Sequence, residues 1–313
     1  MDIGEYRKCN GKGINIKNIT IENYPEINQY FGLRRPETSD SNILDLYLWA
    51  NCYPTWYYCT DKALIWIAKS EDGTYYSSIP CCRQEDIKEA FYETESFFNQ
   101  ILGKKLTMYV VDKAAIEQLE LPEDKYIVVR DRAYDDYIYD AEKLRTLSGR
   151  KYHKKKNHLN SFKREYEGRY EFKLLDFANK NEIYEFLQKW TDLKKDAAQR
   201  EYIEYEARGI EEVFAYYDIL QFKIGGVYVD GKLEAFTIGK YYPEENMVYI
   251  SVEKANPDIR GLYAYINNEF LIQAFPMASK VNREDDMGIE NLRKAKESYY
   301  PIYMIEKYTI IQK

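Results

Sequence analysis

The stretch MVYISVEKANPDIRGLYAYINNEFLIQAF, residues 247–275, decides the fold. It predicts a strand at Met247–Glu253, a loop, and a helix at Leu262–Phe275. A glycine-bearing turn into a helix start offers free backbone N–H groups and the positive end of the helix dipole, which suit an anion such as pyrophosphate. Arg260 adds a guanidinium fork, and Gly261 lets a ligand approach the backbone closely. The alternative is an ordinary turn whose glycine serves loop geometry only.

The elements around this stretch follow a regular order. Upstream, a strand at Tyr170–Leu174 and two amphipathic helices lead into a hairpin whose turn is Asp230-Gly231, a strong two-residue signal. Downstream come a helix at Ile289–Glu297 and a final strand at Tyr303–Ile311. The C-terminal half therefore predicts the order β-α-α-β-β-β-α-β-α-β, and the first half predicts a similar mixture of short strands and helices.

The chain has 313 residues, which fits two domains of ordinary size. We expect an α/β (mixed-sheet α+β) protein with an N-terminal domain at 1–135, a basic connecting helix region at 136–168 and a C-terminal domain at 169–313.

Composition limits the cellular compartment and the kinds of site that we expect. No run of about 18 apolar residues is present, so no membrane-spanning segment is predicted. The polar segment Met1–Gly13 lacks the apolar core of a signal peptide. Five cysteines without metal-like grouping indicate a reduced compartment, and we expect the cytoplasm. With only two histidines, a His-based zinc site or a Ser-His-Asp triad is disfavoured, and no metal is expected.

One short segment is strongly basic in a chain of net charge −7. Residues 150–164 hold seven Lys and Arg, both histidines and no acid. On a helix, Lys151, Lys154, Lys155 and His158 share one face. This face predicts docking of phosphate from a transfer-RNA acceptor stem, a nucleotide cofactor or an anionic headgroup. The alternative is a solvated helix that neutralises nearby acidic surface.

An acid-rich turn, Asn282-Arg283-Glu284-Asp285-Asp286-Met287-Gly288, precedes the helix at Ile289–Glu297. Carboxylates are favourable at a helix start, so Asp285 or Asp286 as an N-cap is one interpretation. The other is recognition of an amine substrate, because clustered carboxylates bind an ammonium group and accept its proton.

Several motifs together resemble a bacterial family related to the C-terminal domain of phosphatidylglycerol lysyltransferases. They run from roughly Ser39 to the C-terminus and include the following: Leu147-Ser148-Gly149-Arg150-Lys151, Lys155-Lys156-Asn157-His158, Glu253-Lys254-Ala255, Arg260-Gly261-Leu262-Tyr263, Ile266-Asn267, the acid-rich turn and Leu292-Arg293-Lys294-Ala295. The resemblance implies two tandem domains of the GNAT acyltransferase fold, related also to Fem-type peptidoglycan aminoacyltransferases. The lysyltransferases carry a large membrane-spanning region that this sequence lacks.

The loop itself resembles the acyl-CoA loop of GNAT enzymes. Its Arg260-Gly261 core matches, whereas the flanking positions are Asp258 and Tyr263. The resemblance implies cofactor-binding positions at Lys254, Arg260, Gly261, Leu262 and Tyr263. The basic segment and the acid-rich turn supply the candidate substrate-binding positions, which are Lys151, Lys155, Asn157, His158, Asn282, Arg283, Asp285 and Asp286.

In GNAT-like enzymes a side chain near the parted central strands takes the proton of the amine, and a tyrosine after the last helix often protonates the leaving thiolate. By position, this resemblance implies Glu253, at the end of its strand, as the base and Tyr299 or Tyr300 as the acid; either tyrosine could equally be a core residue. We expect transfer of an acyl group from acyl-CoA or aminoacyl-tRNA to a small amine or hydroxyl acceptor. The altered loop disfavours coenzyme A, and the basic helix favours transfer RNA. The alternative function is a GNAT scaffold that binds a ligand without turnover.

Overall fold

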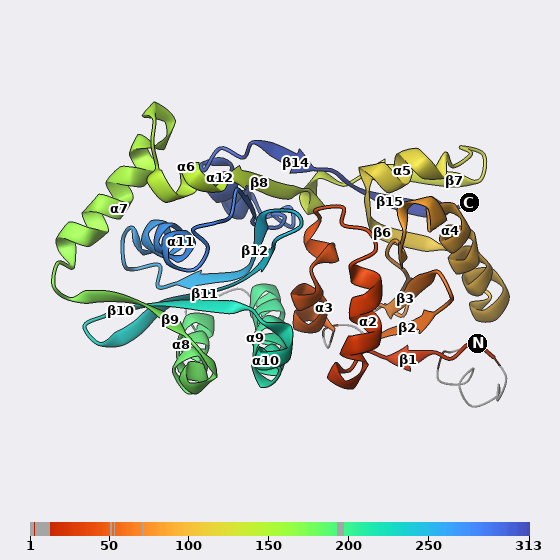
Figure 1. The fold of residues 1–313 in the computed structure, drawn as a ribbon, viewed down its shortest axis with the longest axis horizontal. Helices are drawn as coiled ribbons and strands as arrows, with labels where there is room; N and C mark the ends of the chain where they lie inside the picture. Colours follow the sequence, from red (N-terminus) through yellow and green to blue (C-terminus); the bar gives the residue numbers. More distant parts are fainter. Residues whose placement is uncertain (1–2, 4–12, 51, 53, 71, 193–196) are drawn as a thin grey trace. The chain divides into compact units, whose positions relative to one another are not determined.

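A computed structural model of the protein describes residues 3, 13–50, 52, 54–70, 72–192 and 197–313. Most of the polar N-terminal segment, Cys9 included, lies outside the described residues. The chain forms two compact units (Figure 1). Unit 1 comprises Met1–Asp135 and Ile305–Lys313, and unit 2 comprises Asp136–Met304. Unit 2 is therefore inserted into unit 1 along the sequence.

Unit 1 contains two sheets. The larger has the order β1-β2-β3-β4, with β5 also paired to β3, and the smaller has the order β6-β15-β7, all antiparallel. The strand bounds are β1 Lys17–Asn18, β2 Thr55–Cys59, β3 Ala63–Lys69, β4 Tyr75–Tyr76, β5 Cys81–Cys82, β6 Thr107–Asp112, β7 Tyr126–Arg130 and β15 Lys307–Gln312. The centre of the smaller sheet is thus the last strand of the chain.

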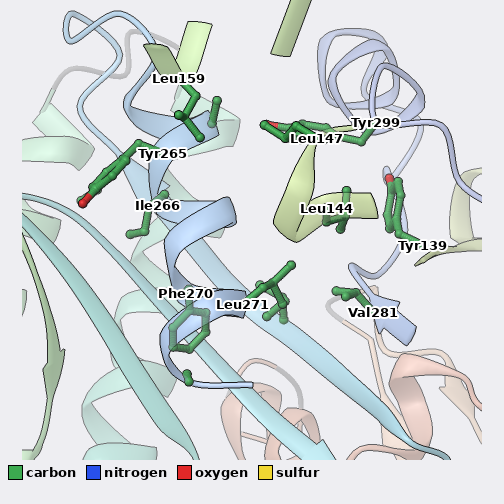
Figure 2. Packing of buried hydrophobic residues seen from close by; sticks show 14 of the residues in the cluster. Tyr139, Leu144, Leu147, Leu159, Tyr265, Ile266, Phe270, Leu271, Val281 and Tyr299 are labelled. Carbon is green, nitrogen blue, oxygen red and sulfur yellow. The ribbon is translucent and has the colours of Figure 1, made fainter. Parts of the chain in front are cut away.

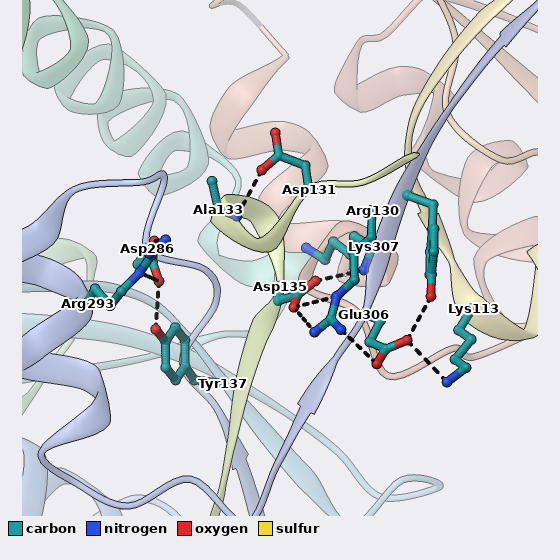
Figure 3. A network of polar contacts seen from close by, with 11 residues as sticks. Lys113, Arg130, Asp131, Ala133, Asp135, Tyr137, Asp286, Arg293, Glu306 and Lys307 are labelled. Carbon is teal, nitrogen blue, oxygen red and sulfur yellow. Dashed lines mark hydrogen bonds and ion pairs between the residues drawn. The ribbon is translucent and has the colours of Figure 1, made fainter. Parts of the chain in front are cut away.

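The helices of unit 1 are α2 Tyr24–Phe31, α3 Ile43–Trp49, α4 Ile87–Ser96 and α5 Lys113–Leu119. A π-helical turn at Phe97–Leu102 extends α4, and Gly103, with φ 64°, ends it in the left-handed conformation that glycine adopts without strain. Arg130 contacts the carboxylates of Asp135 and Glu306 at the edge of the smaller sheet (Figure 3).

Unit 2 is built on one sheet of seven strands in the order β14-β8-β13-β12-β11-β10-β9. The bounds are β8 Asp136–Asp140, β9 Tyr170–Leu175, β10 Lys223–Val229, β11 Lys232–Tyr242, β12 Met247–Ala255, β13 Lys280–Asn282 and β14 Tyr303–Ile305. The β12–β13 pair is parallel, whereas β9 to β12 form an antiparallel meander. Asp230 and Gly231 close the β10–β11 hairpin with φ 51° and 76°, as their sequence predicted.

The helices of unit 2 are α6 Ala141–Thr146, α7 His153–Glu165, α8 Lys180–Asp192, α9 Ala197–Ala215, α10 Tyr217–Leu220, α11 Leu262–Gln273 and α12 Glu290–Glu297. Helices α8 and α11 cover opposite faces of the sheet. Phe236 on β11 packs on Phe186 of α8, with ring centroids 5.8 Å apart, whereas a Cβ at Gly239 would lie 3.2 Å from Phe270 of α11. No helix in the described part of the chain is both long enough and apolar enough to cross a membrane.

The core of unit 2 forms around α11, which contacts the sheet as well as α6 and α7 (Figure 2). Tyr265, Ile266, Phe270 and Leu271 of this helix are almost completely buried in the same cluster as Leu144 of α6. Each large side chain so buried contributes about 1.5–3 kcal/mol of stability. Most sides of α11 are apolar and buried, so it is the central helix of unit 2. These contacts fix the position of the first turn of the helix.

The element order predicted for the C-terminal half is confirmed, with two changes. A short additional helix, α10, lies between α9 and β10. The expected final strand at Tyr303–Ile311 is divided at Glu306 into β14 and β15. β14 joins the sheet of unit 2, and β15 joins the smaller sheet of unit 1, where Ile310 is fully buried. The boundaries of the compact units differ from the expected domains accordingly.

Residues 136–168 also lie differently from the expected connecting region. β8 pairs with β13, and Tyr137 and Tyr139 on this strand are fully buried in unit 2. α6 and α7 pack on α11. The segment is therefore an integral layer of unit 2, and only the helical character expected for its second part is confirmed.

Candidate active site

The candidate site lies where β12 and β13 part. Residues 247–249 pair with 280–282, but β12 runs on to Ala255. Residues 250–255 thus have β11 as their only strand neighbour among the described residues. Ser251 is the additional residue of a β-bulge, because Ile238 pairs with Val252 while the next residue of β11 pairs with Ile250. Bulges of this kind are frequent beside active sites.

An ion pair joins the two parted strands. Arg283, the first residue after β13, donates from Nη2 to Oε1 of Glu253 on β12 at 2.8 Å. Asn267 of α11 donates from Nδ2 to the other carboxylate oxygen at 3.0 Å. The side chains of Arg283 and Glu253 are only 12% and 11% exposed. The carboxylate is therefore held in one orientation, with lone pairs left to accept a further hydrogen bond.

Two tyrosine rings flank the guanidinium of Arg283. Its Cζ lies 4.9 Å from the ring centroid of Tyr299 and 5.8 Å from that of Tyr139, both labelled in Figure 2. Burial raises the pKa of Tyr299 to about 12; the charge of Arg283 opposes this shift and that of Glu253 adds to it. Tyr299 is thus protonated at neutral pH and is a weak proton donor.

A second cation reaches the same place from α7. Nζ of Lys155 lies 3.8 Å from the ring centroid of Tyr299. Burial lowers the pKa of Lys155 to about 8, and repulsion by Arg283 adds to this shift while Glu253 opposes it. Among the residues that the structure describes, none forms an ion pair or a hydrogen bond with this ammonium. The predicted residues Glu253, Tyr299, Lys155 and Arg283 are therefore brought together.

More positive charge surrounds this cluster. His158 follows Lys155 by three positions on α7, and Arg260 is exposed just before α11. Burial lowers the pKa of His158, and the charges of Arg260, Lys155 and Lys154 lower it further. The surface next to the start of α11 is thus positive, as the basic segment predicted.

The reason for glycine at position 261 differs from the predicted one. Gly261 has φ 87°, and a Cβ there would lie 2.2 Å from the carbonyl oxygen of His158 and 3.1 Å from Cβ of Phe162. The close neighbour is the backbone of α7, so helix packing by itself requires glycine here, and the approach of a ligand stays a prediction. Leu262, the next residue, is fully buried in the core.

The opposite face of β12 carries Lys254. Its Nζ lies 2.7 Å from Oε2 of Glu206 on α9 and 4.7 Å from the ring centroid of Trp190 on α8. Trp190 donates from Nε1 to the carbonyl oxygen of Ala255 at 3.0 Å. The charge of Lys254 is therefore balanced within the protein, on the face of the sheet away from Glu253.

Tyr263, another predicted cofactor-binding position, lies at the start of α11 and is 38% exposed.

The acid-rich turn is largely structural. Asp286 is completely buried, and its carboxylate accepts two hydrogen bonds from Arg293, both at 2.9 Å, and one from Tyr137 at 2.6 Å (Figure 3). Burial raises the pKa of Asp286, but the hydrogen bonds from Arg293 and Tyr137 outweigh it and lower this pKa to about 2. Asn282 is equally buried and donates to Asp136 at 3.1 Å. We correct the substrate-binding prediction for both residues.

Neither aspartate is an N-cap, because α12 begins at Glu290 with Ile289 in the capping position. Asp285 instead accepts from the backbone N–H of Met287 at 2.9 Å. The remaining candidates, Lys151 and Asn157, are exposed on the basic segment away from the ion pair. Nζ of Lys151 lies 5.2 Å from the ring centroid of Tyr300.

Sequence reasoning missed two contributors to the site, Asn267 and Tyr139. Asn267 carried a usable signal, since a polar residue within a mainly apolar helix requires a buried hydrogen-bond partner. Tyr139 lies on β8, a strand within the region that was expected to be a connecting helix.

The parted strands beside the start of a central helix define a mixed α/β protein with a GNAT-like fold. In agreement, a tandem GNAT protein from the clavulanic acid biosynthesis pathway aligns with a TM-score of 0.52 and 10% identity, over 96% of this chain and 98% of that one. At this identity the likeness concerns the fold alone.

The chain belongs to the family described as phosphatidylglycerol lysyltransferase, C-terminal, which matches residues 31–311. A conserved protein from Bacteroides thetaiotaomicron VPI-5482 has a similar structure. It aligns with a TM-score of 0.87 and 30% identity, over 96% of this chain and 100% of that one. The structure of L-PGS from Bacillus licheniformis aligns with a TM-score of 0.65 and 16% identity, over 94% of this chain and 92% of that one.

A curated relative from Mycoplasmoides gallisepticum, the uncharacterized protein MYCGA3080, is 26% identical over 204 residues. The match covers 65% of this chain and 64% of that relative. The chain therefore spans less than two thirds of this relative.

Proposed function

We propose that unit 2 transfers an aminoacyl group from an ester donor, such as an aminoacyl-tRNA, to a hydroxyl or amine acceptor. The observation that carries the proposal is the meeting of Glu253, Arg283, Tyr299 and Lys155 where β12 and β13 part. These residues come from four separate segments of the chain, and together they supply a proton acceptor, a proton donor and positive charge. Family membership supports the same reaction class.

The acidity of Tyr299 supports an ester donor over a thioester. A thiol has a pKa of about 8.5, so a thiolate leaves without needing a proton. An alkoxide is a much stronger base, and protonation of it during departure lowers the barrier. Since the pKa of Tyr299 is raised to about 12, its acidity suits an alkoxide better than a thiolate.

The packing of α7 supports the same choice. The carbonyl of His158 lies where a side chain at position 261 would extend, so α7 packs closely on the turn at which the pyrophosphate of coenzyme A was expected to bind. The positive side chains of Lys154, His158 and Arg260 instead suit the phosphates of a polyanionic donor, with affinity that falls as salt rises.

The reaction then proceeds through the carbonyl carbon of the donor ester. The acceptor oxygen or nitrogen attacks this carbon and loses its proton to Glu253. The bond from carbon to the donor oxygen breaks, and the departing alkoxide takes the phenolic proton of Tyr299. Proton exchange with solvent restores both groups. Asn267 and Arg283 keep the carboxylate oriented throughout.

Incubation with lysyl-tRNA and phosphatidylglycerol vesicles, the pair suggested by the family description, tests the proposal. Lysyl transfer should be measurable by radiolabel in the lipid fraction. Parallel reactions with free amines as acceptors and acetyl-CoA as donor distinguish the other choices. Turnover with acetyl-CoA and none with charged transfer RNA would overturn the choice of donor.

A ligand-binding protein without turnover is a second candidate, favoured by one observation. Both oxygens of the Glu253 carboxylate already accept hydrogen bonds within the protein, one from Arg283 and one from Asn267. Binding of charged transfer RNA without ester loss, together with no effect of Tyr299→Phe on that binding, would support this candidate.

A further inference from the structure

The cluster at Arg283 carries more positive than negative charge. Arg283 and Lys155 are both cationic below the pKa of Lys155, about 8, whereas Glu253 is the one carboxylate that contacts them in the described part of the chain. Excess charge away from water costs free energy unless a partner neutralises it. The proton acceptor and donor proposed above do not remove this excess.

One nitrogen of the Arg283 guanidinium indicates where such a partner would bind. Nη2 of Arg283 is bonded to Glu253, but Nη1 is shielded from solvent and has no hydrogen-bond partner among the described residues. A buried N–H group left without an acceptor costs about 1–3 kcal/mol, and more when it is charged. Protein structures seldom retain such a group without a use for it.

We infer that Nη1 of Arg283 and Nζ of Lys155 together bind one oxyanion of a ligand at the face of Tyr299. The Tyr299 ring is the element both cations share, with Lys155 3.8 Å and Arg283 4.9 Å from its centroid. An oxygen ligand beside this ring accepts from both cations at once. The resulting hydrogen bonds join two charged donors to one acceptor, the strong class of such bonds.

Charge balance selects the chemical class of the ligand. Two cations and one carboxylate leave a single positive charge, so a singly charged oxyanion neutralises the cluster. Carboxylates and phosphodiesters meet this condition at neutral pH, whereas a phosphate monoester carries about two charges. Because Nη2 is already bonded to Glu253, Arg283 offers the ligand one nitrogen and not a bidentate pair. A single donor fits the planar carboxylate and the tetrahedral phosphodiester equally well.

The surroundings of Lys155 agree with this assignment. Glu253, Arg283 and Tyr299 face it from β12, from the loop after β13 and from the end of α12, and Lys154 and His158 lie on α7 itself. Four of these five groups are not anionic at neutral pH. A bound oxyanion would therefore raise the pKa of Lys155 from about 8.

Titration with dimethyl phosphate and with acetate tests the inference without requiring turnover. The intact chain carries ¹³C-methylated lysines, and Lys155→Met identifies the resonance of Lys155. At constant ionic strength, one of these two probes should raise the pKa of Lys155 and saturate; which one does so tells a phosphodiester ligand from a carboxylate. Affinity should fall about tenfold or more as pH passes above the pKa of Lys155.

Matched variants decide whether the site is specific. Lys155→Met should weaken binding about tenfold or more, whereas Lys156→Met, one residue later and exposed on α7, should leave it nearly unchanged. Arg283→Lys keeps the charge but removes Nη1, so it should also weaken binding if the variant folds, as circular dichroism would report.

Equal losses in Lys156→Met and Lys155→Met would reduce the effect to diffuse surface charge and overturn the inference. So would the absence of saturable binding by either probe. Neither result bears on the proposed transfer, which is measured separately. Conversely, anion binding with no transfer would leave this inference standing while the proposed function failed.

Discussion

Two neighbouring residues of β12 face opposite sides of the sheet and have opposite electrostatic surroundings. On one side, Lys254 is paired with Glu206 at 2.7 Å and lies over Trp190, so one cation meets one carboxylate. On the other side, Glu253 is paired with Arg283 at 2.8 Å, and Lys155 adds a second cation. Both pairs are largely buried, but only the first is balanced.

This difference separates a structural ion pair from a functional cluster. A balanced buried pair holds helices to a sheet and needs no further partner. An unbalanced cluster lowers the stability of the free protein and becomes balanced when a ligand arrives. Residues 253 and 254 therefore show that burial and ion pairing alone do not identify a site, whereas the local charge balance does.

The largest expected difference between the two faces is catalytic. Tyr299→Phe removes the proton donor but keeps the ring, and it should lower the rate of aminoacyl transfer by about 10²- to 10⁴-fold. Tyr263→Phe, at the start of α11 on the Lys254 side, is the matched control and should leave the rate unchanged. Single-turnover transfer of labelled amino acid measures both, and equal rates for the two variants would contradict the role of Tyr299.

Breaking the two ion pairs should have unequal costs. Lys254→Met leaves Glu206 buried without a cation and should lower the free energy of unfolding by about 3–5 kcal/mol. Arg283→Met should cost about half as much, because Lys155 remains near Glu253 and is relieved of repulsion. Urea unfolding measures both values. A larger loss of unfolding free energy in Arg283→Met than in Lys254→Met would contradict the proposed difference between the two faces.

The unbalanced face should also respond to alkaline pH. The pKa of Lys155 is lowered to about 8 in the folded protein, whereas an unfolded lysine has a pKa of about 10.4. Between these values the unfolded state binds more protons, so this residue makes stability rise with pH, by about 1–3 kcal/mol. Lys155→Met should remove that rise and Lys154→Met should not, as urea unfolding at several pH values would show.

The smallest effects belong to the exposed residues of the basic segment. Lys151→Ala should weaken binding of a polyanionic donor a few-fold and reduce the slope of log affinity against log salt by about 0.7–0.9. Asn157→Ala, without a charge, should change neither quantity. Filter binding at several salt concentrations would detect the difference; identical slopes in wild type and Lys151→Ala would exclude a phosphate contact there.

Much of the fold was predictable because its signals are local. Turn residues such as Asp230-Gly231 and the start of α11 at Leu262 are encoded within a few positions of where they act. The catalytic pair was nominated from its position along the elements, and its members do lie in one cluster. Donor and acceptor stay predictions, since no sequence pattern specifies them.

What could not be predicted depends on contacts between distant segments. The pairing of Glu253 with Arg283 joins residues 30 positions apart, and the carbonyl of His158 restricts Gly261 across more than 100 positions. The role of the acid-rich turn was mispredicted for the same reason. Asp286 was expected to bind a substrate, but it is buried and bonded to Tyr137. Local propensity carries no information on such partners.

The position of β15 has a consequence for how the molecule is made. Its residues, 307–312, lie between β6 and β7, two strands that precede all of unit 2 in the sequence. A ribosome therefore delivers every residue of unit 2 before the strand that joins β6 to β7. Most of unit 2 therefore exists before β6 and β7 gain their shared neighbour, and until then the smaller sheet of unit 1 has two open edges, exposed to pairing with other chains.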